Sequence, residues 1–226
     1  MQHEDIGQND ATLHYLDVIY RLTIDGDAAR TTEIANRLRV TASGASVMLR
    51  RLAERKLVQL TPYKGATLTA EGKRIALRTI RRHRMFELFL VKFMGFAWHE
   101  VDEHAHALET VITDGLEARM DEMLNHPTRC PHGHLIPGRD GRLPDVRDVM
   151  LVAQPVGCSG VIQCIDTDNS EWLRYIGELG LTPGTHVTLK EIAPYGGPVT
   201  LSAAGRTHTL GKNLAELVFI EIDHAA

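Results

Sequence analysis

The sequence predicts a mainly α-helical protein with a small β domain at its C-terminal end. Residues 8–125 are apolar at helical intervals, residues 126–148 are rich in Pro and Gly, and residues 150–222 are rich in Val, Ile, Thr and Gly. The 226 residues, 43% of them apolar, are enough for two or three small domains with their own cores. We therefore expect domains at 1–73, 74–126 and 150–226, with a linker at 127–149.

The first part of the chain has the pattern of a helix-turn-helix. Residues 11–22 place Leu13, Leu16 and Ile19 on one side, as an amphipathic helix does. A short helix over 31–38, capped by Thr, and a second helix over 41–55 follow one another closely, which is typical of a helix-turn-helix. The apolar residues expected to hold these two helices together are Ile34, Ala35, Leu38, Val40, Val47, Leu49, Leu52, Leu57 and Val58.

Two short extended runs, residues 57–60 and 66–69, come next around a turn at 61–65, which predicts a wing. The second helix of such a unit enters the major groove, so small polar residues at its start approach base edges and later cations meet phosphates. The residues expected to contact DNA are Thr41, Ser43, Gly44, Ser46, Arg50, Arg51 and Lys64. Tyr63 is expected to pack beneath the wing. The alternative is that Arg50 and Arg51 belong to an ordinary solvated helix face.

The charge distribution also separates the beginning of the chain from the rest. Residues 1–84 hold 15 Lys and Arg against 9 Asp and Glu, whereas residues 85–226 hold 10 against 20. A basic N-terminal part favours a domain that binds a polyanion such as DNA. Three irregularly spaced Cys, no signal-peptide pattern and no run of about 18 apolar residues predict a soluble cytoplasmic protein without membrane contact.

Acidic and imidazole side chains occur at helical intervals in three segments. The first helix, a long helix starting at Ala70 and a further helix expected over 99–124 each carry such a set. The sets are His14 and Asp17, then His83 and Glu87, then Asp102, His106 and Glu109. Nitrogen and oxygen ligands without a thiolate favour Mn(II) or Fe(II) over Zn(II). Each His taken alone is more often a surface or hydrogen-bonded core histidine.

The last part of the chain predicts a small antiparallel barrel. Residues 160–165, 186–192, 199–203 and 218–222 are short apolar runs separated by Gly-containing turns, and one helix over 170–179 interrupts them. Before the barrel, Cys130, His132 and His134 suggest zinc. Because no second ligand pair stands at a suitable spacing, we expect a structured turn there instead.

Seven motifs of this sequence follow one another in a recognisable order. They are Tyr15-Leu16-Asp17-Val18-Ile19-Tyr20, Ile34-Ala35 to Val58, Leu68-Thr69-Ala70-Glu71-Gly72, Arg82-His83-Arg84 to Glu87, Val101 to Val111, Ile136-Pro137-Gly138 and Glu178-Leu179-Gly180-Leu181-Thr182-Pro183-Gly184. Over nearly the whole chain they resemble the diphtheria-toxin-repressor family of metal-dependent regulators, including its manganese-sensing branch. The resemblance implies an N-terminal winged helix-turn-helix, a helical dimerisation domain that holds metal, and a C-terminal SH3-like barrel of the FeoA type.

The resemblance also implies which residues bind metal. His83, Glu87 and Glu109 match ligands of the family, whereas Thr110 stands where relatives have a His. Other ligand positions hold residue types that differ from those of relatives, namely His14, Asp17, Asp102 and His106. In the barrel, Asp168 and Glu171 stand near extra ligands of the iron branch, or they belong to a turn that caps the following helix. The loss of soft Met and Cys ligands favours Mn(II), with Fe(II) as the alternative.

The function implied by the resemblance is that of a metal-dependent homodimeric regulator that binds a palindromic operator in double-stranded DNA and represses metal-uptake genes. No catalytic residue and no small-molecule substrate are expected. Two alternatives stay open. One is a metal-independent winged-helix adaptor whose barrel binds a peptide or protein. The other is a metal-dependent hydrolase, which needs an open coordination position beside a general base.

Overall fold

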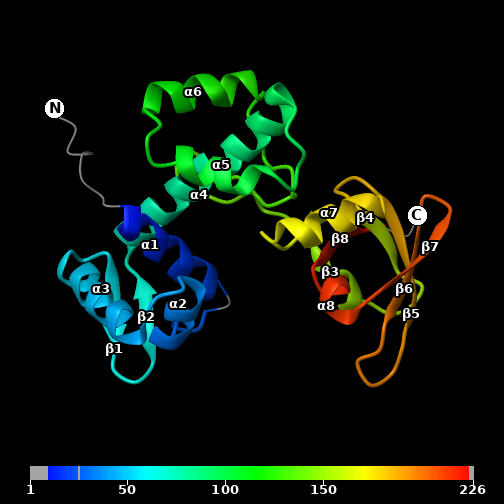
Figure 1. Cartoon of the computed structure of the whole chain (residues 1–226), viewed down its shortest axis with the longest axis horizontal. Helices are drawn as coiled ribbons and strands as arrows, with labels where there is room; N and C mark the ends of the chain where they lie inside the picture. Colours follow the sequence, from blue (N-terminus) through cyan, green and yellow to red (C-terminus); the bar gives the residue numbers. More distant parts are fainter. Residues whose placement is uncertain (1–9, 25, 224–226) are drawn as a thin grey trace. The chain divides into compact units, whose positions relative to one another are not determined.

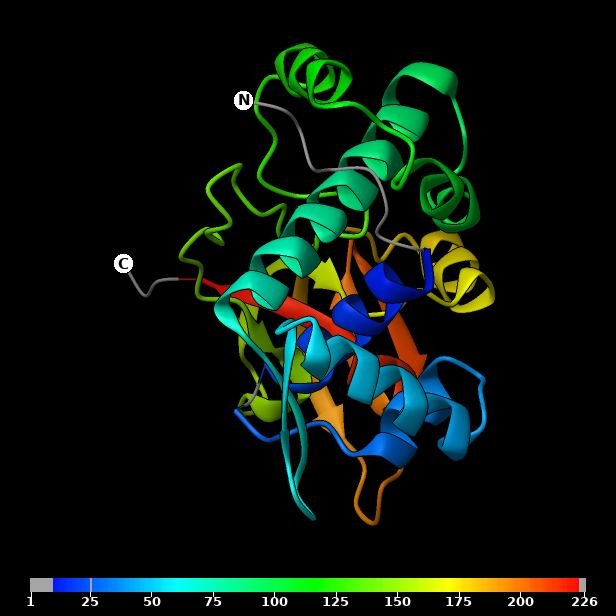
Figure 2. The same ribbon diagram turned by 90° about the vertical axis from the view of Figure 1, so that its left-hand side faces the viewer.

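The computed structural model describes residues 10–24 and 26–223 (Figure 1). The described residues divide into two compact units, one formed by those up to 81 together with 137–142, the other by 82–136 and 143–223. Figure 2 gives a second view, in which the length of α4 (Ala70–Met94) can be followed. The three-domain division with boundaries at 73, 126 and 149 stays a prediction. Among the described residues, no helix is both long and apolar enough to cross a membrane.

The first unit is a winged helix-turn-helix, as predicted. Its elements are α1 (Asp10–Leu22), α2 (Thr31–Arg37), α3 (Ala42–Glu54), β1 (Val58–Thr61), β2 (Gly65–Leu68) and the first half of α4 (Ala70–Met94). Strands β1 and β2 pair antiparallel, from Val58 opposite Leu68 to Thr61 opposite Gly65. Fully buried Leu16, Ile19, Ile34 and Leu52 fill the core between the helices and the wing. This core fixes α3 against α1 and α2.

Some local details of this unit differ from the prediction. Helix α2 begins after Arg30 rather than at a Thr cap, and the Arg30 backbone N–H donates to Glu33 over 2.9 Å. Val40 and Val47, expected in the core, are each 44% exposed. For Val47 the reason is helical geometry: Ala45 and Leu49 face the core, and a residue two positions from both lies on the other side of the helix.

The helical part of the second unit contains the second half of α4, α5 (Val101–Leu108) and α6 (Asp114–Met123). The single helix predicted over 99–124 is therefore wrong. Residues 110–112 are all β-branched, which disfavours a helix there. The hydroxyl of Thr113 then accepts from Leu116 N over 3.3 Å and caps a new helix, α6. Buried Met85, Ala105 and Met120 form a core between the three helices.

The β domain of the second unit is a six-stranded antiparallel sheet in the order β3-β8-β4-β5-β6-β7. Its elements are β3 (Val149–Met150), the 3₁₀ turn η1 (Leu151–Ala153), β4 (Ser159–Ile165), α7 (Ser170–Glu178), β5 (His186–Ile192), β6 (Val199–Ala203), β7 (Arg206–Leu210), α8 (Lys212–Ala215) and β8 (Val218–Ile222). Four strands and α7 match the prediction closely. Strands β3 and β7 and helix α8 were not predicted.

Candidate metal centre and nucleic-acid interface

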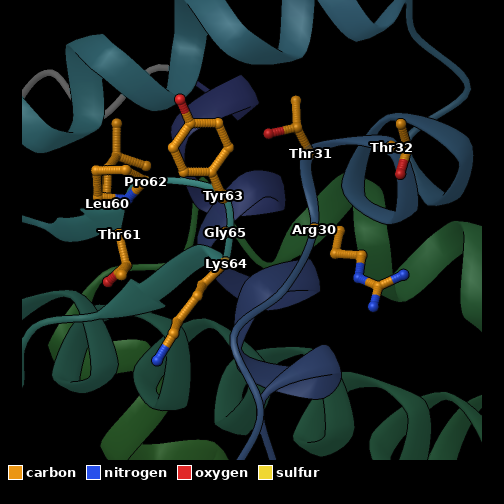
Figure 3. Close-up of a pocket in the computed structure, with 9 residues that line it drawn as sticks. All are labelled: Arg30, Thr31, Thr32, Leu60, Thr61, Pro62, Tyr63, Lys64 and Gly65. Atoms are coloured by element: carbon orange, nitrogen blue, oxygen red, sulfur yellow. The ribbon is translucent and has the colours of Figure 1, made fainter.

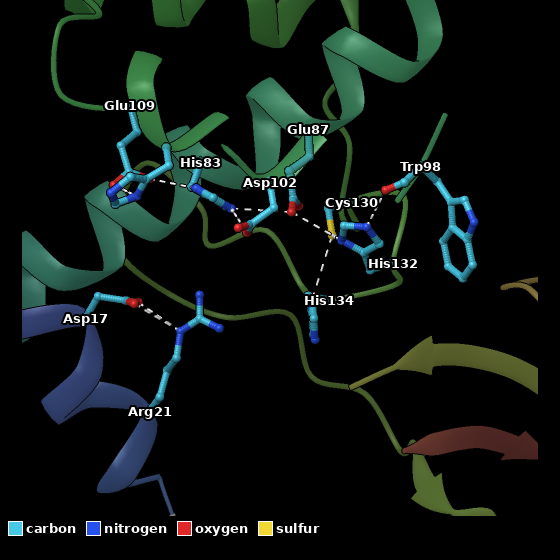
Figure 4. Close-up of polar contacts among 11 residues, drawn as sticks. Asp17, Arg21, His83, Glu87, Trp98, Asp102, Glu109, Cys130, His132 and His134 are labelled. Carbon is cyan, nitrogen blue, oxygen red and sulfur yellow. Dashed lines mark hydrogen bonds and ion pairs between the residues drawn. The ribbon is translucent and has the colours of Figure 1, made fainter. Parts of the chain in front are cut away.

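Helices α4 and α5 bring His83 into contact with three carboxylates (Figure 4). Its Nδ1 lies 2.7 Å from Glu109 Oε2, and its Nε2 lies 3.3 Å from both Glu87 Oε1 and Asp102 Oδ1. His83, Glu87 and Glu109 are buried. Of the five residues predicted from these two helices, Glu87, Asp102 and Glu109 therefore meet at the His83 imidazole, and His106 does not contact it.

The hydrogen bond at Nδ1 of His83 determines whether Nε2 can act as a metal ligand. At 2.7 Å, Nδ1–H donates to Glu109, which leaves the Nε2 lone pair directed at two carboxylates unless a proton or a cation lies between them. Burial lowers the pKa of His83, but hydrogen bonds with Asp102, Glu109 and Glu87 outweigh it, so this pKa is well above its ordinary value. The site therefore favours a positive charge at Nε2.

Spacing and chemistry of these ligands fit a divalent ion. Two ligand atoms about 2.1 Å from one ion lie about 3.0 to 3.4 Å apart at octahedral or tetrahedral angles. The two 3.3 Å separations from His83 Nε2 fall in this range. Glu87 Oε2 is buried and has no hydrogen-bond partner, which a ligand atom lacking its ion would explain. One nitrogen and several carboxylate oxygens suit Mn(II) or Fe(II).

Beside this cluster, residues 130–134 form the predicted structured turn. Gly133 N donates to Cys130 O over 2.9 Å, and Cys130 N donates to His134 O over 3.0 Å. Unexpectedly, one ligand atom from each of Cys130, His132 and His134 lies within 4.8 Å of the others. His132 Nδ1 is also 3.2 Å from Glu87 Oε1. The turn thus places a second group of possible ligands against the first.

The sequence reasoning missed part of this neighbourhood. The Cys-x-His-x-His spacing at 130–134 was visible, but a search for a second pair along the chain could not find Glu87, which α4 supplies. It also missed two oxygens that orient the turn, namely the Trp98 carbonyl, 2.7 Å from His132 Nε2, and Asp166 Oδ1, 3.1 Å from His134 Nε2.

The remaining residues predicted from the second unit occupy varied surroundings. His106 is half exposed, with Nδ1 3.3 Å from Glu109 Oε1, and the ring of His104 packs against Phe96. Asp168 and Glu171 are exposed, and the three-ligand groups found among the described residues do not include them. The helix beside them is capped by Asn169, which accepts from Trp172 N. That Asp168 and Glu171 bind metal stays a prediction.

The predicted ligands of the first unit lie on α1. Asp17 accepts from Arg21 Nε of the same helix, with both carboxylate oxygens 3.1 Å away (Figure 4). His14 is partly buried. That these two side chains bind metal stays a prediction.

Helix α3 and the wing present the side chains predicted to contact DNA. Thr41 Oγ1 accepts from Gly44 N over 3.1 Å and so begins the helix. Ser46 is partly exposed, and the other predicted contacts are exposed, namely Thr41, Ser43, Gly44, Arg50, Arg51 and Lys64. The apolar side of the helix faces the core, so this polar and basic face is available to a ligand.

The wing borders a pocket of about 420 Å³ beside the start of α2 (Figure 3). Its lining is Arg30, Thr31, Thr32, Leu60, Thr61, Pro62, Tyr63, Lys64 and Gly65. The expectation that Tyr63 packs beneath the wing is wrong, because its side chain is fully exposed at the tip, where its φ of 62° belongs to a tight turn. Tyr63 and Lys64 point to opposite sides of the wing.

Comparison with protein families covers most of the chain. Residues 10–66 match the N-terminal DNA-binding domain of iron-dependent repressors, residues 69–138 match their metal-binding and dimerisation domain, and residues 149–222 match the FeoA domain. The iron-dependent repressor IdeR of Mycobacterium leprae is 28% identical in an alignment of length 224 that covers 94% of this chain and 97% of that protein. The diphtheria toxin repressor of Corynebacterium efficiens is 29% identical in an alignment of length 223 that covers 94% of this chain and 95% of that protein.

Solved structures give the same result. A manganese-dependent transcriptional repressor in complex with manganese superposes with a TM-score of 0.87 at 34% identity, over 93% of this chain and 99% of the other. The manganese regulator SloR superposes with a TM-score of 0.79 at 28% identity, over 94% and 98%. These relatives are DNA-binding repressors and not enzymes, so the hydrolase alternative finds no support. The chain therefore belongs to the family of iron- and manganese-dependent transcriptional repressors that includes the diphtheria toxin repressor.

Proposed function

We propose that this chain is a cytoplasmic homodimeric repressor that binds a palindromic operator when Mn(II), or alternatively Fe(II), occupies a site formed by His83, Glu87 and Asp102. The observation that carries this proposal is the His83 imidazole, whose Nε2 faces two carboxylates at 3.3 Å. Metal-uptake genes are the proposed targets, by analogy with the family.

The residues at this site have two roles, orienting the imidazole and supplying ligand atoms. Glu109 accepts from His83 Nδ1 and holds the ring so that Nε2 is directed at the ion position. Glu87 and Asp102 supply negative oxygens from α4 and α5. A bound divalent ion supplies the positive charge that neutralises these carboxylates, which otherwise repel one another.

The link to DNA is a coupling free energy between two sites. A typical value of 1 to 3 kcal/mol would tighten operator binding by roughly 5- to 150-fold, and DNA would tighten metal binding by the same factor. In a symmetric dimer the two α3 helices must lie about 34 Å apart to enter successive major grooves of a palindrome. We propose that the ion stabilises the arrangement with that spacing.

Exposed apolar side chains on the helices of the second unit support a dimer, since soluble monomers rarely expose many of them together. They are Phe93 and Met94 at the end of α4, Leu108 at the end of α5, Val111 after it, and Leu116 and Met123 on α6. Residues 69–138, which contain them, are also the part that matches a dimerisation domain.

The experiment selects an operator from a random double-stranded library with Mn(II)-loaded protein, then measures binding by fluorescence anisotropy across a Mn(II) titration. Wild-type protein should bind roughly 5- to 150-fold more tightly with metal. Asp102→Asn and His83→Gln should lose this stimulation. Glu122→Gln, which changes only an exposed ion pair with Arg119, should keep it.

Two results would contradict the proposal. Equal operator occupancy before and after chelation would favour the metal-independent adaptor. Full Mn(II) stimulation of both ligand variants would mean that the ion acts elsewhere. Repeating the titration with Fe(II) under anaerobic conditions decides between the two ions.

A further inference from the structure

The turn at 130–134 holds its two imidazoles in the orientation of metal ligands. His132 Nε2 donates to the Trp98 carbonyl over 2.7 Å, and His134 Nε2 donates to Asp166 Oδ1 over 3.1 Å. In a neutral imidazole the other nitrogen then carries a lone pair. Both Nδ1 atoms lie 4.0 Å from Cys130 Sγ. Oxygen acceptors behind metal-binding histidines are the usual way in which proteins fix the ring and the tautomer.

The spacing around Cys130 fits one ion with little movement. A sulfur about 2.3 Å and a nitrogen about 2.1 Å from a tetrahedral ion are about 3.6 Å apart. The observed 4.0 Å separations need a shift of only a few tenths of an ångström. Cys130 and His132 are almost completely buried, so the ligands would be shielded from water. Cys164, the other buried thiol, is outside this cluster.

Glu87 connects this turn to the site on α4 and α5. Its Oε1 is 3.2 Å from His132 Nδ1 and 3.3 Å from His83 Nε2. Two imidazole lone pairs therefore approach one carboxylate from different elements. Its Oε2 is buried without a hydrogen-bond partner. A single ion at either side would leave the other imidazole nitrogen facing a carboxylate with no cation between them.

We propose that the centre holds two ions that share the Glu87 carboxylate. The first is the Mn(II) or Fe(II) ion at His83 and Asp102, on which this inference rests as part of the proposed function. The second is a Zn(II)-like ion bound by Cys130, His132 and His134, because a thiolate with two imidazoles suits a borderline ion in tetrahedral geometry. Glu87 is the fourth ligand of the second ion.

The first experiment counts ions with cobalt(II) chloride added to the full-length protein after removal of metal by a chelator. A thiolate bound to Co(II) gives a charge-transfer absorption in the near ultraviolet, which an oxygen and nitrogen site does not give. Wild-type protein should show this band, and Cys130→Ser should lose it together with one equivalent of bound cobalt. Cys164→Ser should keep both, because it removes a buried thiol that is not a proposed ligand. Circular dichroism checks that each variant is folded.

The second experiment tests whether Glu87 is shared. Glu87→Gln is combined with Cys130→Ser, which leaves only the first site, and with Asp102→Asn, which weakens the first site and leaves the second. Cobalt affinity measured by equilibrium dialysis should fall by about tenfold or more in both backgrounds. Glu117→Gln is the matched control, because Glu117 is a buried glutamate paired with Arg82 instead of a ligand. It should change neither affinity by more than about twofold.

The possible outcomes separate this inference from the proposed function. Absence of the thiolate band, with Mn(II) still stimulating DNA binding, overturns the second ion alone. An effect of Glu87→Gln in only one background shows that the carboxylate is not shared. If Cys130→Ser and Asp102→Asn each abolish all binding, the two clusters form one site and the inference is wrong. If wild-type protein binds no ion at this centre, the proposed function fails as well.

Discussion

Helix α3, which carries most of the predicted DNA contacts, and the candidate metal centre on α4 and α5 use polar side chains in opposite ways. On α3 the polar residues are exposed, and Thr41 caps the helix, so the surface forms without a ligand. At the candidate metal centre His83 and Glu87 are buried and Asp102 is partly exposed, and His83 Nε2 faces the carboxylates of Glu87 and Asp102. The first surface is complete by itself, whereas the second needs a positive charge.

This difference indicates where metal can act. A cation at His83 changes the charge balance of a buried site, where desolvated carboxylates carry large costs. It leaves the side chains on α3 as they were. Metal should therefore alter how often the recognition helices are correctly placed and should not alter which bases they prefer. The following variants test the separation between the two regions.

The largest effect is expected from Gly133→Ala. Gly133 has a φ of 91°, and a Cβ there would collide with the Gln163 carbonyl oxygen and the Cys164 Cα. Strain and overpacking together should cost about 3 kcal/mol and displace the turn at 130–134. Calorimetry of the second unit's transition measures this cost. Gly184→Ala is the control, because it has a φ of 93° and open space. An equal loss of unfolding free energy in the two variants would show that small shifts of neighbouring atoms relieve the collision at Gly133.

A smaller effect is expected from Val47, which is exposed on α3 among the predicted base contacts. An exposed valine there can contact thymine methyl groups in the major groove. Val47→Ala should weaken operator binding by up to about tenfold, from the loss of about 0.8 kcal/mol per buried carbon. Replacing operator thymines by uracils removes the methyl partners. If replacing thymine by uracil weakens operator binding by the same factor in the wild type and in Val47→Ala, Val47 does not contact the thymine methyl groups.

Helix capping should contribute equally in the two units, because it is a local effect. Thr41 caps α3 and Thr113 caps α6, each through a hydroxyl that accepts from a backbone N–H. Changing either to Ala should lower the free energy of unfolding by about 1 kcal/mol, and changing either to Ser should not. Chemical denaturation followed by circular dichroism measures both. If one of the two Ala variants loses no stability, tertiary contacts already hold the helix end at that position.

The smallest effect is expected from Arg50→Ala. If exposed Arg50 contacts one phosphate, the slope of log affinity against log salt should be smaller by about 1 in Arg50→Ala than in the wild type. The reduction should be the same for every DNA sequence tested. Between 50 and 200 mM salt that difference in slope corresponds to about a fourfold change in affinity. The measurement is a salt titration with and without Mn(II). An unchanged slope would assign Arg50 to the solvated helix face.

Local sequence patterns were sufficient for most of the fold. The strands His186–Ile192, Val199–Ala203 and Val218–Ile222 match the predicted bounds, because alternation between turns is a local signal. The break between α5 and α6 was missed, since helical periodicity on both sides concealed the β-branched residues before Thr113. Exposed Val47 was assigned to the core because apolar character alone does not say which side of a helix is covered.

The candidate site was predictable only where its residues share a helix. His83 and Glu87 follow from a spacing of four on α4, and Asp102 and His106 from the same spacing on α5. The contact between Glu87 and His132 joins elements 45 positions apart, and no local pattern contains it. The same applies to the Trp98 carbonyl, because any residue type has this acceptor.

The packing of Trp98 has a practical consequence. Its indole rests on Gly177 of α7, where a Cβ would come within 2.8 Å of the indole nitrogen, and its carbonyl holds His132. With Trp172→Phe, Trp98 is the remaining tryptophan of the chain. Its intrinsic fluorescence then reports whether the turn at 130–134 and α7 stay packed against Trp98. The measurement needs no dye and can be made in the presence of DNA.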